Sequence, residues 1–240
     1  MKILAFDSSN QALSIALLED ESLLGQMTFN LKKNHSITLM TSIDFLMSQA
    51  GVQAKELDRI ALAQGPGSYT GLRLASSVAK TMAYSLNKEL VGISSLFAIA
   101  SRQKDKEKYI VPIMDARRGN AYSSVYQNNQ EVVAEAHLDF AEFLKEEIFH
   151  DHKEKFVFTG QVENFKDIII SQGFTEEQIV SDGLDQLPSA YELGKKAINM
   201  EPVEVHSFAP NYLKKVEAEE KWLEKNEGKD KSADDYVKRI

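Results

Sequence analysis

The chain has 240 residues, no cysteine, and 36 acidic against 28 basic side chains, which gives a formal net charge of −8. Lack of cysteine excludes a disulfide scaffold and a thiolate metal site, and the acidic balance argues against a protein that binds RNA unaided. No run approaches the roughly 20 apolar residues of a membrane span, and Asp7 comes too early for a secretory signal, so we expect a cytoplasmic globular protein.

The first half of the chain predicts a three-stranded meander followed by a helix and two strand–helix pairs. The expected strands are 3–9, 12–18, 23–29, 59–63 and 90–93, and the expected helices are 35–50, 72–86 and 96–100. The polar stretch 103–108 marks the boundary at which this first unit ends.

The second half repeats the opening. The expected strands are 109–114, 121–126, 131–136, 155–159 and 179–180, and the expected helices are 140–149, 165–171, 189–200 and a last one that opens at Pro210. A strand–Asp–strand–strand unit that recurs about 110 residues later indicates a duplicated domain. We therefore predict an α/β fold of two actin-like, RNase H-like domains, each a mixed five-stranded sheet flanked by helices. Residues 1–104 form the first domain, 105–226 the second with its closing helix, and 227–240 a charged, mobile tail.

A glycine-rich turn connects the expected strand 59–63 to the expected helix 72–86, and it contains Gly65, Gly67 and Gly71. A helix N-terminus suits a phosphate, but it contributes only about 0.3–1 kcal/mol to an anion. Micromolar nucleotide binding needs roughly 8 kcal/mol, and the lysine of a P-loop is absent. The turn is therefore either a tight structural connection or part of a phosphate or partner contact.

Asp7 and Asp115 each end the first strand of a predicted domain. Two acids that face each other across a cleft could hold Mg²⁺ through waters, or each could cap its own turn by Asx hydrogen bonds. Arg117 and Arg118 stand where a phosphate loop would have glycines, so we expect no autonomous ATP hydrolysis. The sequence contains no His-Glu-x-x-His pair and no Gly-x-Ser-x-Gly elbow, and we expect neither a metal site nor a self-sufficient catalytic group.

Two predicted helices have unusual faces. Helix 72–86 places small residues along one stripe, which lets another helix approach closely within the fold or across a subunit interface. Helix 35–50 is apolar over more than one face, which suits a helical interface.

Several motifs, in this order, resemble the TsaB (YeaZ) family. They are the segments 3–9, His35-Ser36, 65–73 and 115–118, and the Pro210-x-Tyr212-Leu213 segment. The string Gly-Pro-Gly-Ser-Tyr-Thr-Gly-Leu-Arg at 65–73 is long enough to be specific, and the resemblance extends to Val216. The chain departs from the family pattern at Tyr69, where Phe is commoner, and at Lys214, where Arg is usual.

This resemblance implies an actin-like fold without a working active site, in the machinery that makes threonylcarbamoyladenosine next to the tRNA anticodon. In that family the catalytic paralogue TsaD transfers the threonylcarbamoyl group, TsaB pairs with it through N-terminal helices, and the ATPase TsaE docks on the pair. The resemblance implies a non-catalytic scaffold that activates TsaD, forms a homodimer when isolated, and meets tRNA only through the complex. No intrinsic cofactor is implied, with ATP or ADP–Mg shared at the interface with TsaD.

Carried onto this chain, the family's interface helices are 35–50 and 70–86. The expected partner-facing residues are His35, Ile37, Leu39, Met40, Ile43, Met47, Leu72, Ala75, Ser76, Ala79, Met82 and Ala83. The expected contacts to a shared nucleotide or phosphate are Asp7, Ser8, Ser9, Gly65, Gly67, Ser68, Thr70, Arg73, Arg117 and Arg118. Two alternatives stay open: a small actin-like ATP-dependent kinase, and an M22 glycopeptidase-like metalloprotein, although the paired metal-binding histidines of the latter are absent.

Overall fold

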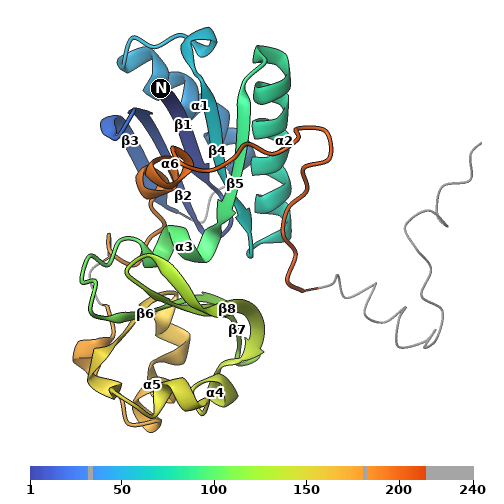
Figure 1. The fold of residues 1–240 in the computed structure, drawn as a ribbon. Helices are drawn as coiled ribbons and strands as arrows, with labels where there is room; N and C mark the ends of the chain where they lie inside the picture. Colours follow the sequence, from blue (N-terminus) through green and yellow to red (C-terminus); the bar gives the residue numbers. More distant parts are fainter. Residues whose placement is uncertain (32–34, 181–182, 215–240) are drawn as a thin grey trace, which may run out of the picture.

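The computed structural model describes residues 1–31, 35–180 and 183–214, which form two lobes built around two β-sheets (Figure 1). The N-terminal lobe holds a five-stranded sheet in the order β3-β2-β1-β4-β5. Its strands are β1 (Lys2–Asp7), β2 (Ala12–Glu19), β3 (Ser22–Asn30), β4 (Arg59–Gly65) and β5 (Glu89–Ser94). Because β1 runs antiparallel to β2 and parallel to β4, the sheet is mixed, as the sequence predicts.

Helices cover both faces of this sheet. They are α1 (His35–Gln49) and α2 (Tyr69–Leu86) on one face, and α3 (Ser95–Ala100) and α6 (Ala190–Ala197) on the other. The alternation of side chains along β1 explains the two layers, since Leu4 and Phe6 pack toward α1 and α2 while Ile3 and Ala5 pack toward α3 and α6. The small-residue stripe of α2 lies against the sheet, within the fold.

The C-terminal lobe holds a sheet in the order β8-β7-β6-β9. Its strands are β6 (Tyr109–Asp115), β7 (Asn120–Gln127), β8 (Gln130–Asp139) and β9 (Phe156–Gly160). In the described residues this sheet has four strands, and the prediction of a fifth is wrong. The segment expected as that strand joins β9 by a single bridge, Phe158 to Ile179, and one hydrogen bond, from Val180 N–H to the Phe158 carbonyl at 2.9 Å.

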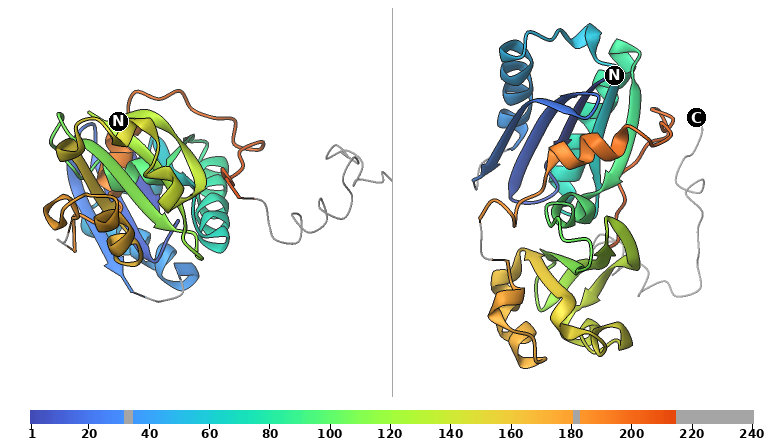
Figure 2. Two further views of the ribbon diagram at one scale, coloured as in Figure 1. Left: turned by 90° about the horizontal axis from the view of Figure 1, so that it is seen from below. Right: turned by 60° about the vertical axis from the view of Figure 1, so that its left-hand side comes forward.

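The helix expected over 140–149 is interrupted. The structure has α4 (Phe140–Phe143), then a turn, then a short 3₁₀ helix at Glu147–Phe149. Phe140 and Phe149 are both fully buried in the core of this lobe. On a continuous helix they would lie on opposite faces, because nine residues amount to two and a half turns. Burial of both rings therefore requires the break. Beyond β9, α5 (Lys166–Ser171) covers the same side of the sheet (Figure 2).

After the C-terminal lobe the chain returns to the first one. Helix α6, which we expected within the C-terminal domain, begins at its cap Ser189 and packs on the N-terminal sheet. A side chain at Gly194 would lie 2.4 Å from Leu18 Cδ1, so a larger residue there would force the buried Leu18 side chain to shift. Residues 201–214, which we call the C-terminal strap, then follow β5 and α2, and Phe208 enters the N-terminal core (Figure 1).

The last predicted helix is absent from the part of the chain that the structure describes. Pro210 to Lys214 are not helical, and Asn211 N–H instead donates to the Gln64 carbonyl at 2.8 Å. The remainder of that helix and the charged tail 227–240 lie outside the described residues. Within the described ranges, no helix is both long enough and apolar enough to cross a membrane.

Candidate functional site

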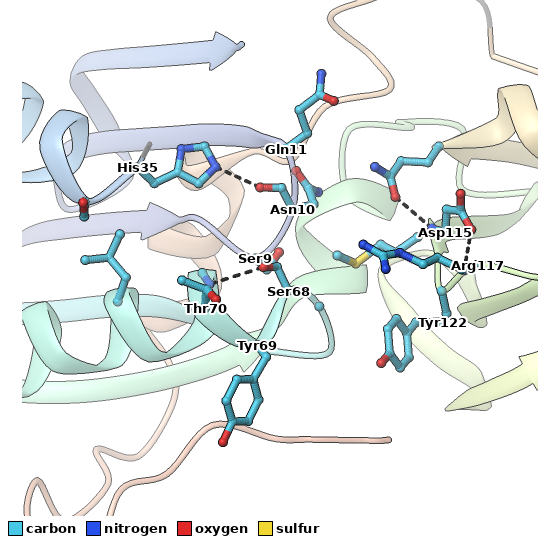
Figure 3. Close-up of a pocket in the computed structure, with 17 residues that line it drawn as sticks. Ser9, Asn10, Gln11, His35, Ser68, Tyr69, Thr70, Asp115, Arg117 and Tyr122 are labelled. Carbon is cyan, nitrogen blue, oxygen red and sulfur yellow. Dashed lines mark hydrogen bonds between the residues drawn. The ribbon is translucent and has the colours of Figure 1, made fainter. Parts of the chain in front are cut away.

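A cleft of about 630 Å³ lies where the two lobes meet (Figure 3). The N-terminal lobe contributes the turn between β1 and β2, the start of α1, and the start of α2. The C-terminal lobe contributes the end of β6 and the turn after it, together with Tyr122 on β7 and Gln161 beyond β9. The lining residues are Ser9, Asn10, Gln11, His35, Ser36, Gly67, Ser68, Tyr69, Thr70, Gly71, Leu74, Met114, Asp115, Ala116, Arg117, Tyr122 and Gln161.

The glycine-rich turn packs directly on the β1–β2 turn. A side chain at Gly67 would lie 2.3 Å from the Ser9 carbonyl oxygen, and one at Gly71 would lie 2.1 Å from that of Ser8. Ser68 N–H donates to the Ser9 carbonyl at 2.6 Å, and the Ser8 hydroxyl donates to the Gly71 carbonyl at 3.0 Å. These contacts leave no room for a side chain at Gly67 or Gly71, so both glycines are explained by the close packing of the two turns.

The start of α2 nevertheless keeps free donors. The Ser68 hydroxyl caps the helix by accepting from Gly71 N–H at 3.3 Å, which is why α2 begins at Tyr69. The backbone N–H groups of Tyr69 and Thr70 have no hydrogen-bond partner in the described part of the chain, and both residues line the cleft. The hydroxyl of Ser9, a fully buried residue of the cleft lining, is likewise unpartnered among the described residues.

Asp7 is fully buried behind the cleft and does not line it. Its Oδ1 accepts from Ser9 N–H at 2.6 Å, which is an Asx turn, and its Oδ2 lacks a partner in the described ranges. Burial of the carboxyl raises the pKa of Asp7 to about 6, against the weaker opposing effect of the hydrogen bond from Ser9 N–H. Ionisation of the Asp7 carboxyl therefore costs free energy in the folded state, and a ligand in the cleft cannot reach it.

Asp115 also caps its own turn. Its Oδ1 accepts from Arg117 N–H at 2.6 Å, and its Oδ2 accepts from Asn164 Nδ2 at 2.8 Å. The described residues contain no group of three or more histidine, aspartate or glutamate side chains placed to hold a metal ion. The arrangement fits the capping alternative at both acids.

The arginines expected at a phosphate occupy different places. Arg117 lines the cleft, whereas Arg118 next to it is exposed and outside the lining; both have positive φ in the β6–β7 turn. Arg73 lies beside the cleft mouth, with its guanidinium 4.0 Å above the Tyr69 ring and its Nε donating to Tyr212 Oη at 3.3 Å. Gly65 is buried beneath the strap, where a side chain would lie 2.3 Å from the Asn211 carbonyl oxygen.

The residues expected to face a partner divide into two groups. Seven are buried in the chain's own core, against the sheet or between α1 and α2, because the inner faces of both helices carry them: Leu39, Ile43, Met47, Leu72, Ala75, Ala79 and Ala83. Ser76 is buried too, Met82 is half-buried, and His35 turns inward to place Nε2 2.9 Å from the Asn10 carbonyl. Ile37 and Met40 remain exposed on the outer face of α1.

Sequence reasoning did not select Tyr122 or Gln161. Gln161 Oε1 accepts from Asp115 N–H at 2.8 Å and so holds the end of β6. Its signal was present, because β6 and β9 are parallel neighbours and the residues after two such strands meet at one sheet edge. Tyr122 carried no signal of its own, since alternation alone does not show which face of β7 meets the other lobe.

Comparison with known proteins assigns the family. A family model described as "TsaD: tRNA N6-adenosine threonylcarbamoyltransferase" matches residues 22–222. The tRNA threonylcarbamoyladenosine biosynthesis protein TsaB of Bacillus subtilis is 33% identical over 228 residues, which cover 93% of this chain and 99% of that protein. TsaB of Escherichia coli is 26% identical and is matched over 65% of this chain and 67% of its own length.

Among solved structures, YeaZ from Pseudomonas aeruginosa has the same fold, with a TM-score of 0.71 at 24% identity over 88% of this chain and 99% of that one. This likeness and the two lobes confirm the predicted actin-like architecture. The chain belongs to the TsaB family of tRNA threonylcarbamoyladenosine biosynthesis proteins.

Proposed function

We propose that the chain is a non-catalytic subunit that binds and activates TsaD, together with TsaE, in the cytoplasm. The reaction served is threonylcarbamoylation of the adenosine next to the anticodon, in tRNAs that read codons beginning with A. The observation that carries the proposal is a set of three exposed apolar side chains on the outer half of α1, where Thr41, Asp44 and Ser48 are also exposed. Its members, Ile37, Met40 and Phe45, are 71%, 45% and 56% exposed.

The neighbouring helix adds apolar side chains that are only partly covered. Leu74, Val78 and Met82 of α2 are half-buried apolar side chains on the same side of the sheet as α1. Large apolar side chains gathered on one surface usually mark a protein interface. A stable complex buries on the order of 1,600 Å² in total, and two adjacent helices can supply one side of it. The same surface serves a homodimer when TsaD is absent.

The cleft supports a role without chemistry of its own. The first acid of the fold, Asp7, is sealed behind the lining, and the second, Asp115, has both oxygens occupied by N–H donors. We therefore propose that ATP or ADP–Mg used by the complex lies at the interface with TsaD, bound mainly by the partner, and that this chain has no intrinsic cofactor.

Reconstitution tests this proposal. Purified TsaD, TsaE, tRNA, ATP–Mg and a threonylcarbamoyl donor are expected to give modified tRNA only when the chain is added, at a rate that saturates at one chain per TsaD. Titration calorimetry of the isolated chain with ATP–Mg is expected to show binding no tighter than about 1 mM, because a lone helix terminus supplies little of the free energy required. Micromolar ATP binding together with modification that does not depend on the chain would favour the kinase alternative instead.

A further inference from the structure

We propose that the cleft and its rim bind unpaired nucleotides of an RNA strand. By rim we mean Tyr69, Arg73 and Tyr212 on the N-terminal lobe and Arg117 and Tyr122 on the C-terminal lobe. This inference rests on the proposed function, because it supposes that the chain works beside a tRNA-modifying subunit. It adds a direct contact between this chain and the RNA, which neither the family assignment nor the proposed role as a scaffold requires.

The N-terminal side of the rim is a stacked group of two tyrosines and an arginine. The Tyr69 and Tyr212 rings lie 5.1 Å apart, and the Arg73 guanidinium lies 4.0 Å above Tyr69. Both rings remain exposed, at 40% and 38%. Arg73 donates one hydrogen bond, from Nε to Tyr212 Oη, and its terminal N–H groups have no partner among the described residues. A stacked arginine is held in one orientation, so it can bind a phosphate at lower entropic cost.

The C-terminal side of the rim faces it with a second arginine and a third aromatic ring. Figure 3 shows Arg117 reaching from the β6–β7 turn toward Ser9 and Ser68, with Tyr122 beside it. Neither Arg73 nor Arg117 forms an ion pair within the part of the chain that the structure describes, unlike Arg59, which pairs with Glu89 at 2.6 Å. In a chain of net charge −8, two unpaired arginines at one cleft mouth are a local positive site.

The interior of the cleft has the groups that read a base edge. Its hydroxyls and amides include the unpartnered, fully buried hydroxyl of Ser9 and the free backbone N–H groups of Tyr69 and Thr70. The volume of about 630 Å³ falls in the range of roughly 300–1,000 Å³ typical of small-molecule pockets. Proteins that bind single-stranded RNA combine these elements: aromatic rings for stacking, arginines along the phosphates, and polar groups for the base.

The decisive experiment uses the assembled complex of the chain with TsaD. The double variant Arg73→Ala/Arg117→Ala is expected to raise the Kd for tRNA about tenfold, and to reduce the salt dependence of log Kd by about 1.4, which is about 0.7 for each lost phosphate contact. Lys145→Ala, which removes an exposed positive charge that pairs with Glu142 and lies outside the cleft lining, is the control and is expected to leave the Kd unchanged. An unchanged Kd and salt slope in the double variant overturn the proposal.

Arg73 also holds Tyr212, so its loss could loosen the strap. Arg117→Ala alone answers this concern, because the Arg117 side chain makes no hydrogen bond, ion pair or cation–π contact with the described residues. This variant is expected to melt as the wild type does and still to lose about half of the effect on the salt slope. If Arg117→Ala leaves the slope unchanged while Arg73→Ala lowers the melting temperature, Arg73 is a strap anchor and the proposal is wrong.

Photocrosslinking locates the contact. A single-stranded oligoribonucleotide containing 4-thiouridine is expected to crosslink to Tyr69, Tyr122 or Tyr212 in the complex, in the presence of 1 mM ATP. Crosslinks confined to TsaD overturn the proposal. Displacement of the RNA from this chain by ATP also overturns it, because it shows that the cleft is a site for free nucleotide. If the proposed function is wrong, the result differs: the chain then neither binds TsaD nor stimulates transfer, in the wild type as in the variants at 73 and 117.

Discussion

Replacement of Met40 and Phe45 together by aspartate is expected to weaken binding of the chain to TsaD at least about 100-fold. Truncation of a central apolar anchor costs about 2 kcal/mol or more, and a carboxylate left in a closed interface adds a desolvation penalty. Both side chains lie on the outer face of α1, so the variant is expected to fold normally. Calorimetric titration with TsaD measures the affinity, and a thermal melt checks the fold.

Controls for this variant come from the other lobe. Val132 and Ile170 are also exposed apolar residues, at 46% and 38%. Val132→Asp and Ile170→Asp introduce the same charge away from α1 and are expected to keep wild-type affinity. Equal affinity of the Met40/Phe45 variant and these controls would show that the partner binds elsewhere. Substitution of Ala79 or Ala83 cannot serve this purpose, because both are buried and a charge there would unfold the chain.

Asp7→Asn is expected to raise the free energy of unfolding by up to about 3 kcal/mol at neutral pH. The folded-state pKa of Asp7 is raised to about 6 from 3.8, because the carboxyl is fully buried and Oδ2 has no partner in the described ranges. Below pH 3.8 both states bind the proton and the group costs nothing. As the pH rises from 3.8 to 6 the unfolded state ionises first, so the wild type loses stability over that window and does not regain it above pH 6.

The asparagine avoids this loss and keeps the Asx turn, since its Oδ1 still accepts from Ser9 N–H. Denaturant unfolding at pH 3.5 and at pH 7.5 measures the effect, which should be near zero at the first and largest at the second. Asp44→Asn, on the exposed face of α1, is the matched control and should change stability by less than about 0.5 kcal/mol at either pH. Reconstituted tRNA modification should be retained in Asp7→Asn, whereas a loss of activity with a gain of stability would assign Asp7 a direct part in the chemistry.

The order of the elements could be read from the sequence because most of them carry a clear period. β1, β2 and β4 are apolar runs bounded by polar or glycine-containing turns, and α1 repeats apolar residues at helical spacing. Where burial conflicts with helical period, as for Phe149, the sequence rule fails, because phenylalanine counts as apolar whichever face it lies on. The return of α6 to the first lobe was equally hidden, since the same Ala, Leu and Gly pattern would serve against either sheet.

The sequence predicted the individual segments of the candidate site, but not how they come together. The glycine turn, Asp7 and Asp115 were recognisable as the ends of strands, and the two acids were expected either to share an ion or to cap their turns. The choice depended on whether Asn164 Nδ2 reaches the Asp115 carboxylate and whether the fold buries Asp7, and both are matters of tertiary structure. The stack of Tyr69, Arg73 and Tyr212 joins residues far apart in the chain, with Arg73 and Tyr212 separated by 139 positions, and no local pattern predicts it.

The measurement that tests the central claim most directly is mass spectrometry of tRNA nucleosides after depletion of the chain in its own cells. Threonylcarbamoyladenosine is expected to fall toward the limit of detection, to return with a wild-type copy or with Asp7→Asn, and to stay low with Met40→Asp/Phe45→Asp. Unchanged threonylcarbamoyladenosine after depletion, or full restoration by the Met40/Phe45 variant, would contradict a role as the partner that activates TsaD through α1.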